Sequence, residues 1–371
     1  MNPFNLDRRM IRSFDWILLL CIIIITGIGM AMVYSASHTV NADPAFYLKR
    51  QAIALVISVV AFLVGMLLDY NFLQRFYKAI YLAMLILLVL VFFLGEESDM
   101  GGLRWIPLGS FNLQPSEVAK ICLILSMAAY LDTYENTESF APILKSLVFL
   151  VPPLLAVLKQ PDLGTATVLI VITGSLFFLF GVPWRYLLTL LTSGLAMLPV
   201  LWLNINEDQK KRIYVFLDPF NNQHGDDAWQ LLQSLVAIGA GGLWGSGYLK
   251  GSQTQLRFLP ESHTDFIYST VAEELGFVGA AGLIIVYLIL IWRILSIAFS
   301  ARDRYGRLVA SSVAYLMLYH LLVNVGMTLG IMPITGIPLP MVSYAASNLL
   351  TVFFAMGVVL SIGLRRSKPM F

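Results

Sequence analysis

The chain of 371 residues is 58% hydrophobic and 12% charged, with a mean hydropathy of +0.78 and a formal net charge of +2. Because about a quarter of the residues in soluble domains are charged, this composition indicates an integral membrane protein. Basic residues are scattered between apolar runs instead of forming one patch, which argues against nucleic acid as a partner. The two cysteines, Cys21 and Cys122, lie within apolar runs and predict neither a disulfide framework nor a metal site.

Apolar runs recur along the whole chain. A membrane-spanning helix needs about 20 apolar residues, and this template predicts about ten such helices. They begin near residues 16, 48, 77, 117, 142, 163, 184, 268, 308 and 343. The first run ends without a signal-peptide cleavage pattern and is expected to remain as a helix. The predicted fold class is an all-α integral membrane protein, with residues 1–371 forming a single polytopic membrane domain.

Basic residues between the apolar runs predict the orientation, because cytoplasmic loops of membrane proteins are rich in Lys and Arg. With ten helices, these residues fall on one face: Arg8, Arg9, Arg12, Arg75, Lys78, Arg293, Arg302, Arg304, Arg307, Arg365, Arg366 and Lys368. Both termini are therefore expected in the cytoplasm. The opposite face is expected to be extracytoplasmic.

Two long stretches lie on the expected outer face. The first, residues 96–115, contains the sequence GGLRWIPLG. The second, residues 206–266 between predicted helices 7 and 8, is far longer than a helix connection needs and is expected to be functional. It contains aromatic and aliphatic residues separated by glycines, which predicts short amphipathic segments lying against the membrane surface.

Ionisable side chains cluster at the end of the second stretch, where LPESHTDF occupies residues 259–266. Charged groups are unfavourable near hydrocarbon, so their presence at the start of a predicted helix indicates function. Asp265 is the favoured catalytic candidate. His263 is either a proton carrier or, as is more common for a lone histidine, a hydrogen-bonding partner. No second histidine stands at metal-ligand spacing from it.

Acidic and basic residues near other helix starts give further candidates. Glu117 and Lys120 are three residues apart and share a helix face, where they either neutralise each other or position a ligand. Asp162 follows a proline, as a helix N-cap does, with a bond to the long outer stretch as the alternative. Glu273 and Glu274 are expected in a structural network rather than in the chemistry.

Two arginines and three polar helix residues complete the set of candidates. Arg104 and Arg257 flank aromatic or apolar residues at the roots of the outer stretches, which suits phosphate binding. His320, Asn324 and Asn348 are expected to form hydrogen bonds between helices and are left out of the predicted site.

Several blocks of sequence together resemble the SEDS (shape, elongation, division and sporulation) family. They are WIPLG at 105–109, QPSEVAK at 114–120, QPDLGT at 160–165, FLPE at 258–261, DFI at 265–267, AEELG at 272–276 and PLPMVSY at 338–344. NVGM at 324–327, GIMP at 330–333 and GSQTQL at 251–256 are more similar to RodA, the elongation member, than to FtsW, the division member. Ala345 and Ala346 depart from the Gly-Gly pair that is usual in the family, and are expected to tighten helix packing.

The resemblance implies ten transmembrane helices and a peptidoglycan glycosyltransferase that polymerises lipid II outside the bacterial cytoplasmic (inner) membrane. It also implies a class B penicillin-binding protein as partner, within the elongation machinery. Asp265 matches the essential aspartate of the family, and Glu117 and Lys120 match its paired charges. Ser343 belongs to the last block and joins the candidate site.

The expected chemistry needs few groups. An acceptor sugar hydroxyl attacks the anomeric carbon of the donor and expels a polyprenyl pyrophosphate, which is already a good leaving group. A base for the hydroxyl and positive charge for the phosphates are therefore required, the latter from Arg or Lys and a divalent cation, Mg or Mn, with no organic cofactor. Two alternatives remain: a lipid II flippase, which ten helices with proline-broken ends also fit, and a non-enzymatic scaffold for a penicillin-binding protein.

Overall fold

The computed structural model describes residues 14–40, 43–97, 102–109, 111–134, 140–204, 206–220 and 225–365, most of them in helices. The helices of 18 or more residues begin close to the predicted positions. They are α2 (Trp16–Ser37), α3 (Phe46–Leu67), α5 (Tyr77–Leu94), α6 (Pro115–Asp132), α7 (Phe140–Lys159), α8 (Leu163–Phe180), α9 (Trp184–Asn204), α13 (Ile267–Phe299), α14 (Arg304–Thr328) and α15 (Ala346–Leu364).

Within the described ranges, seven helices are long and apolar enough to cross a membrane: α2, α3, α5, α8, α13, α14 and α15. α6 is less apolar because Glu117, Lys120 and Asp132 interrupt its sequence. Exposed aliphatic and aromatic side chains cover the outside of the bundle, as the acyl chains of a bilayer require. The structure therefore has the build of a multi-pass membrane protein.

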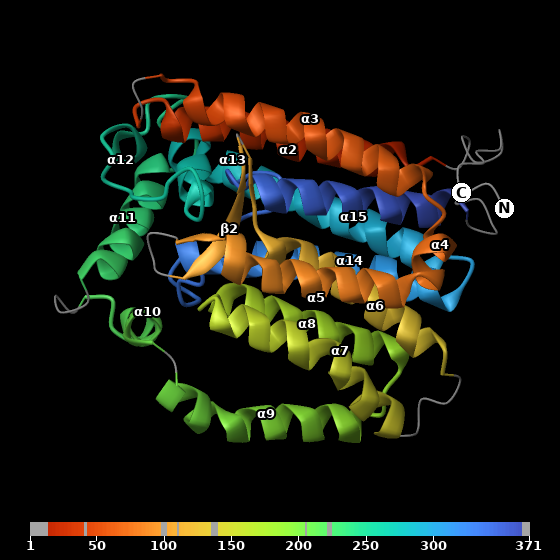
Figure 1. The fold of residues 1–371 in the computed structure, drawn as a ribbon. Helices are drawn as coiled ribbons and strands as arrows, with labels where there is room; N and C mark the ends of the chain where they lie inside the picture. The colour runs from red at the N-terminus through yellow and green to blue at the C-terminus, as the bar shows by residue number, and fades with distance from the viewer. Residues whose placement is uncertain are drawn as a thin grey trace.

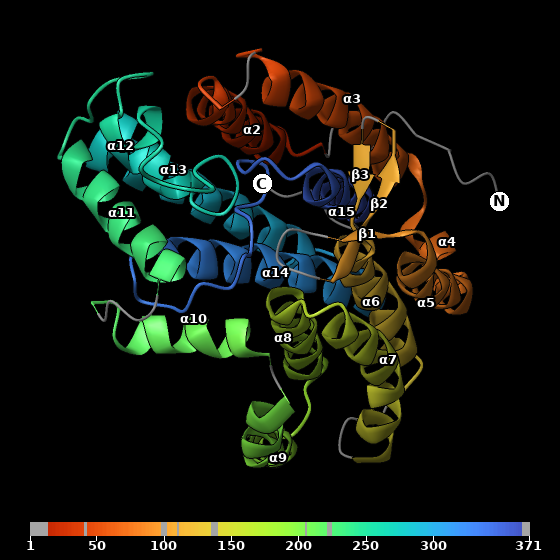
Figure 2. The same ribbon diagram turned by 60° about the vertical axis from the view of Figure 1, so that its left-hand side comes forward.

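The centre of the bundle is formed by the C-terminal helices. α15 packs along α3, α14 packs along α13, and α6 and α8 cover the other side of α14. Figure 2 shows α15 between α3 and α14, with α9 below α8 at the edge of the bundle. Small residues allow the closest crossing: a Cβ at Gly65 of α3 would lie 2.6 Å from the Phe354 carbonyl oxygen of α15.

α13 is broken near its start. Gly276 has φ +69°, outside the helical region, and a side chain there would overlap the loop that precedes α12. The break frees two carbonyl groups of α13. The backbone N–H groups of Ser246 and Gly247 donate to the carbonyls of Glu273 and Glu274, at 2.9 and 3.0 Å. Residues 267–275 are thus tied to the preceding stretch rather than continuing the long apolar helix.

Short elements cover one end of the bundle: α10 (Glu207–Leu217), α11 (Gly225–Gly241), α12 (Ser252–Gln255), and strands β1 (Glu96–Glu97), β2 (Leu103–Leu108) and β3 (Phe111–Leu113) (Figure 1). Residues 206–266 contain helical segments, as predicted, and their position against the membrane surface stays a prediction. α11 packs on α13 and α14, where Ser234 Oγ lies 2.7 Å from Ser269 Oγ and donates to the Thr328 carbonyl.

The three strands correct the all-α prediction. β2 pairs antiparallel with both neighbours, placing Trp105 opposite Glu96 and Ile106 opposite Leu113. Ser347 of α15 holds this small sheet: its hydroxyl donates to the Asn112 carbonyl and accepts from the Gln114 N–H, both at 2.8 Å. The strands therefore belong to the capped end of a helical bundle rather than to a separate domain.

The two alanines at 345–346 stand at the start of α15. Both side chains are partly exposed, and Ala345 has φ −155°, an extended conformation that any residue adopts. Ala346 packs against the hydrophobic core of the bundle, and the expected tightening of helix packing stays a prediction.

The opposite end of the bundle carries basic residues. There, α4 (Tyr70–Arg75), the α13–α14 turn and the end of α15 meet: Tyr70 donates to Asp303 at 2.6 Å, and Arg365 lies 3.8 Å from Asp69. The terminal basic residues used to predict orientation lie outside the described residues; they are Arg8, Arg9, Arg12, Arg366 and Lys368.

Candidate active site

Asp265 lies at the capped end of the bundle, two residues before α13 begins. Its side chain is partly buried, and in the part of the chain that the structure describes no donor forms a hydrogen bond to its carboxylate. Gly336 is its close neighbour. A Cβ at Gly336 would lie 3.4 Å from Asp265 Oδ2 and 3.8 Å from Arg212 Nη1, so the carboxylate and the guanidinium both face this glycine.

The surroundings of Asp265 raise the pKa of its carboxyl group above the ordinary value for an aspartate in water. Burial and the negative charges of Glu261 and Asp162 raise the pKa of Asp265 to about 6, while the positive charge of Arg212 opposes them. A carboxylate with a pKa near neutrality is ionised at pH 7 and still able to accept a proton, as a general base must.

The polypeptide before α15 fixes the loop that carries Asp265. The Ser343 hydroxyl donates to the Thr264 carbonyl at 2.7 Å and accepts from the Leu339 N–H at 2.8 Å. The Tyr344 N–H donates to the His263 carbonyl at 2.9 Å. Residues 336–344 and 263–265 therefore form one bonded unit, in which Ser343 supports the backbone rather than reaching the Asp265 carboxylate.

Asn324 of α14 is hydrogen-bonded to both segments of this unit. Its Nδ2 donates to the carbonyls of Asp265 and Ile337, both at 2.9 Å, and its side chain is fully buried. Sequence analysis left Asn324 outside the site as an ordinary interhelical residue. A polar side chain four residues after His320 on an apolar helix was the available signal, because such residues inside membrane helices mark functional regions.

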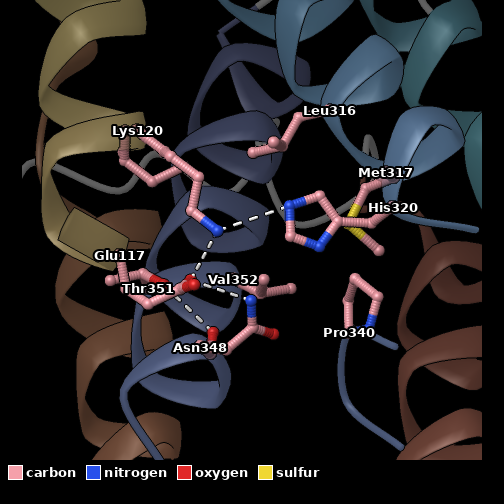
Figure 3. Close-up of a pocket in the computed structure, with 10 residues that line it drawn as sticks. Glu117, Lys120, Leu316, Met317, His320, Pro340, Asn348, Thr351 and Val352 are labelled. Carbon is pink, nitrogen blue, oxygen red and sulfur yellow. Dashed lines mark hydrogen bonds and ion pairs between the residues drawn. The ribbon is translucent and has the colours of Figure 1, made fainter. Parts of the chain in front are cut away.

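Glu117 and Lys120 form an ion pair inside the bundle. Lys120 Nζ lies 2.7 Å from Glu117 Oε2, and each residue is 3% exposed. Asn348 Nδ2 donates to the same Glu117 oxygen at 2.8 Å, and Lys120 Nζ lies 3.3 Å from His320 Nε2. Figure 3 shows Lys120 between the Glu117 carboxylate and the His320 ring.

This network encloses a small cavity of about 10 Å³, near the minimum that holds one water molecule. Its polar lining comes from Glu117, Lys120, His320, Asn348 and Thr351. A cavity of this size is too small for a sugar. The geometry shows that Glu117 and Lys120 neutralise each other, and their alternative role in positioning a ligand stays a prediction.

Asp162 is the N-cap of α8, as its sequence context predicted. Its carboxylate accepts hydrogen bonds from the Thr165 N–H at 2.9 Å and the Thr165 hydroxyl at 2.8 Å. Arg104 holds the neighbouring backbone: Nε donates to the Gln160 carbonyl at 2.8 Å and Nη2 to the Pro161 carbonyl at 2.7 Å. Both side chains thus shape the entrance to α8, beside the Asp265 region.

The adjacent Glu273 and Glu274 support the loop around α12. Glu273 is fully buried and accepts from the N–H groups of Gln253 and Thr254 at 2.7 and 3.1 Å, capping α12. Glu274 accepts from the Ser35 hydroxyl at 2.5 Å and from Gln255 Nε2 at 3.1 Å. These bonds agree with the expected structural network.

The remaining candidates have different surroundings. His263 packs against Tyr47 and Tyr344 with tilted rings, at ring centroid distances of 4.6 and 5.8 Å. Burial lowers the pKa of His263 although Glu261 opposes this, so the ring is neutral at pH 7 and acts as an aromatic partner. Arg257 is exposed, and its positive φ of 60° belongs to the turn after α12, away from the bonds that hold Asp265.

Comparisons with known proteins show which family the chain resembles. The family model for FtsW, RodA and SpoVE, described as "Cell cycle protein", matches residues 15–368. A probable peptidoglycan glycosyltransferase FtsW of Trichlorobacter lovleyi is 40% identical over 97% of this chain and 94% of its own length. The peptidoglycan glycosyltransferase MrdB of Escherichia coli K12 is 41% identical over 77% of each chain.

Solved structures are also similar. A chain from a peptidoglycan synthase complex that coordinates polymerization and crosslinking is 31% identical, with a TM-score of 0.82 over 96% of this chain and 99% of that chain. The rod shape determining protein RodA of Thermus thermophilus is 29% identical, with a TM-score of 0.71 over 96% and 98%. On sequence and on fold, the chain belongs to the SEDS family, the family of FtsW, RodA and SpoVE.

Proposed function

We propose that this protein is a peptidoglycan glycosyltransferase that polymerises lipid II, with Asp265 as the general base. The proposal rests on the Asp265 carboxylate, which is partly exposed and accepts no hydrogen bond from the described residues. Its pKa is raised to about 6. The carboxylates of Asp162, Glu117 and Glu273 are each bonded in structural roles.

The reaction is a direct displacement. Asp265 accepts the proton of the acceptor hydroxyl as its oxygen forms a bond to the anomeric carbon of the donor. The bond between that carbon and the pyrophosphate oxygen breaks, and the polyprenyl pyrophosphate leaves with the electron pair. Attack from the opposite face inverts the anomeric centre, so an α-linked donor gives a β-linked glycan. A covalent sugar trapped on Asp265 would contradict this mechanism.

A divalent cation enters the proposal with the substrate. In the described ranges, no group of three or more His, Cys, Asp or Glu side chains is placed to hold a metal ion. Among the described residues, the protein side chains alone therefore offer no complete ligand set, as is usual for Mg²⁺, which binds to one or two carboxylates together with substrate phosphates. Such a cation would be held by the pyrophosphate oxygens of lipid II, where it offsets their charge.

We further propose ten membrane crossings, with both termini in the cytoplasm and Asp265 on the outer side of the bacterial cytoplasmic membrane. Arg75, Arg304 and Arg365 favour this orientation, because they lie at the ends of α4, α14 and α15 that are far from Asp265. Residues 206–266 would then form the large extracytoplasmic stretch of a single membrane domain. Cysteine labelling of intact cells at position 261 and at position 302 tests it: position 261 is expected to react with an impermeant reagent, and labelling at 302 instead would reverse the orientation.

The partner we propose is a class B penicillin-binding protein, because a similar chain is part of a peptidoglycan synthase complex. Overall identity does not separate the two roles, because the FtsW and MrdB relatives match at 40% and 41%. We therefore base the proposed elongation role on residues 251–256, 324–327 and 330–333, which are more similar to RodA. Restored rod shape in cells depleted of their elongation polymerase is expected. Rescue of division-depleted cells alone would assign the division role instead.

The test uses the purified protein with its partner in liposomes carrying labelled lipid II. Glycan strands from wild type and none from Asp265→Asn are expected. Movement of lipid II between leaflets without polymer would favour the flippase, and equal polymer from Asp265→Asn would favour a scaffold or another base. Glu207→Gln is the matched control, because Glu207 is an exposed carboxylate of the same cap and pairs with Lys210.

A further inference from the structure

Two buried side chains of α14 hold consecutive carbonyl groups beside Asp265. His320 Nδ1 lies 3.2 Å from the Pro338 carbonyl, and Asn324 Nδ2 donates to the Ile337 carbonyl at 2.9 Å. Both side chains are at most 1% exposed. Four residues apart on one helix, they present a single polar edge to the segment that begins at Gly336, the neighbour of the Asp265 carboxylate.

The tautomer of His320 follows from its partners. Lys120 Nζ has only protons to donate, so His320 Nε2, 3.3 Å away, accepts. His320 Nδ1 then carries the proton and donates to the Pro338 carbonyl. A continuous set of bonds therefore runs from the Glu117–Lys120 pair through His320 to the segment beside Asp265.

We propose that Asn324 and His320 are positioning residues that hold the Asp265 carboxylate against Gly336, and that through them the buried Glu117–Lys120 pair acts on the reaction without touching substrate. This inference rests on the proposed function of Asp265. It assigns a role in the chemistry to two helix residues that reach only backbone atoms.

The bonding of Asn324 distinguishes this role from ordinary helix packing. Its Nδ2 satisfies two carbonyl groups that lie 72 positions apart in sequence, those of Asp265 and Ile337. Its Oδ1 is buried and has no partner among the described residues. An unpaired buried oxygen is unfavourable, so any favourable contribution of the Asn324 side chain comes from its two N–H donors. One nitrogen that donates to both segments fixes Asp265 relative to Gly336.

The decisive variant is Asn324→Leu, which keeps the shape of the side chain and removes both donors. We expect kcat for lipid II polymerisation to fall by about 10- to 100-fold, because small displacements of a catalytic group have effects of this size. KM for lipid II is expected to stay within about twofold, since the Asn324 side chain is fully buried inside the bundle. The comparison is made in the purified complex with its partner.

The pH profile separates positioning from general destabilisation. Asp265 faces Glu261 on its own loop, Arg212 of α10 and Asp162 before α8. None of these groups changes in the variant, whereas a loosened segment lets water reach the Asp265 carboxylate. The acid limb of the kcat profile is therefore expected to move to lower pH in Asn324→Leu, because hydration favours the ionised form.

Thr328→Val is the matched control, one turn further along α14. Thr328 is fully buried, and its hydroxyl donates to the Val325 carbonyl of the same helix at 2.8 Å. This variant also loses a buried polar group but is expected to keep the wild-type kcat and pH profile. An equal loss in both variants would show that α14 tolerates no such change, which would overturn the positioning role of Asn324.

The outcomes separate this inference from the proposed function. If Asp265→Asn is inactive and Asn324→Leu has wild-type kcat and acid limb, the inference is wrong and the function stands. If Asp265→Asn polymerises normally, both are wrong. Should Asn324→Leu fail to fold, Asn324→Ser, which retains one donor, is measured in its place. A partial loss of kcat in Asn324→Ser supports the inference, and wild-type kcat there overturns it.

Discussion

Glu261 is the charged group that, after burial, contributes most to the raised pKa of Asp265. In the wild type, a pKa of about 6 leaves Asp265 about nine-tenths ionised at pH 7 and about one-tenth ionised at pH 5. If the ionised carboxylate is the base, the polymerisation rate falls by about tenfold between these pH values. With the ordinary pKa of 3.8, the loss by pH 5 would be under about 10%.

Glu261→Gln tests this account with little change in structure. Glu261 Oε2 accepts from the Thr264 hydroxyl at 2.6 Å, and the amide oxygen of glutamine can take over that bond. Loss of the negative charge favours ionisation of Asp265, so the acid limb is expected to move to lower pH by on the order of half to one unit.

The assay is the initial rate of glycan polymerisation from pH 4.5 to 8, with lipid II above its KM. The control is Glu207→Gln, which removes a carboxylate that is exposed and paired with Lys210; its profile is expected to match wild type. A wild-type rate that stays constant down to pH 4.5 would refute the assignment of Asp265 as a base with a raised pKa. The same shift in both glutamine variants would refute the specific effect of Glu261.

Three further predictions concern stability. At pH 7, Asp265→Asn is expected to have a free energy of unfolding higher than that of wild type by roughly 1–2 kcal/mol, after allowance for solvent screening. The reason is that a raised pKa of an acid means that folding disfavours its charged form above that pKa. A melting temperature in detergent below that of wild type would contradict this. Glu117→Gln leaves the Lys120 charge buried and is expected to cost about 3–5 kcal/mol in denaturant unfolding, with part of the loss recovered when Lys120→Met is added; an unrecovered double variant would argue against the ion pair. Gly357→Ala places a Cβ against the Phe62 carbonyl and is expected to cost about 1–3 kcal/mol by thermal unfolding, whereas unchanged stability would mean that α3 and α15 separate easily.

The transmembrane helices were predictable because the length of an apolar run reflects the thickness of the bilayer. Asp265 could also be selected from the sequence, since a polar run at the start of a membrane helix is unfavourable without a function. The Asp162 cap follows from a local pattern, and the structure confirms it through the bonds to Thr165. Each of these features depends on residues close together in the chain.

The bonds that hold Asp265 could not be predicted in the same way. Asn324 is 59 positions from Asp265, and helical periodicity shows which residues share a face of α14 but not which loop that face meets. The strands β1 to β3 are short, and their pairing depends on contacts with α15. The break at Gly276 leaves little trace in an apolar sequence, because its cause is the close approach of residues 241–247.

The measurement that tests the central claim most directly is the polymerisation rate of purified lipid II by the wild type and by Asp265→Asn, each folded and bound to its partner. Any crosslinking activity of the proposed penicillin-binding partner is blocked, so that only glycan strands are scored. A rate in Asp265→Asn at or below the detection limit, with Glu207→Gln at the wild-type rate, is the expected result. Long glycan strands from Asp265→Asn at the wild-type rate would contradict the role of Asp265 as the general base.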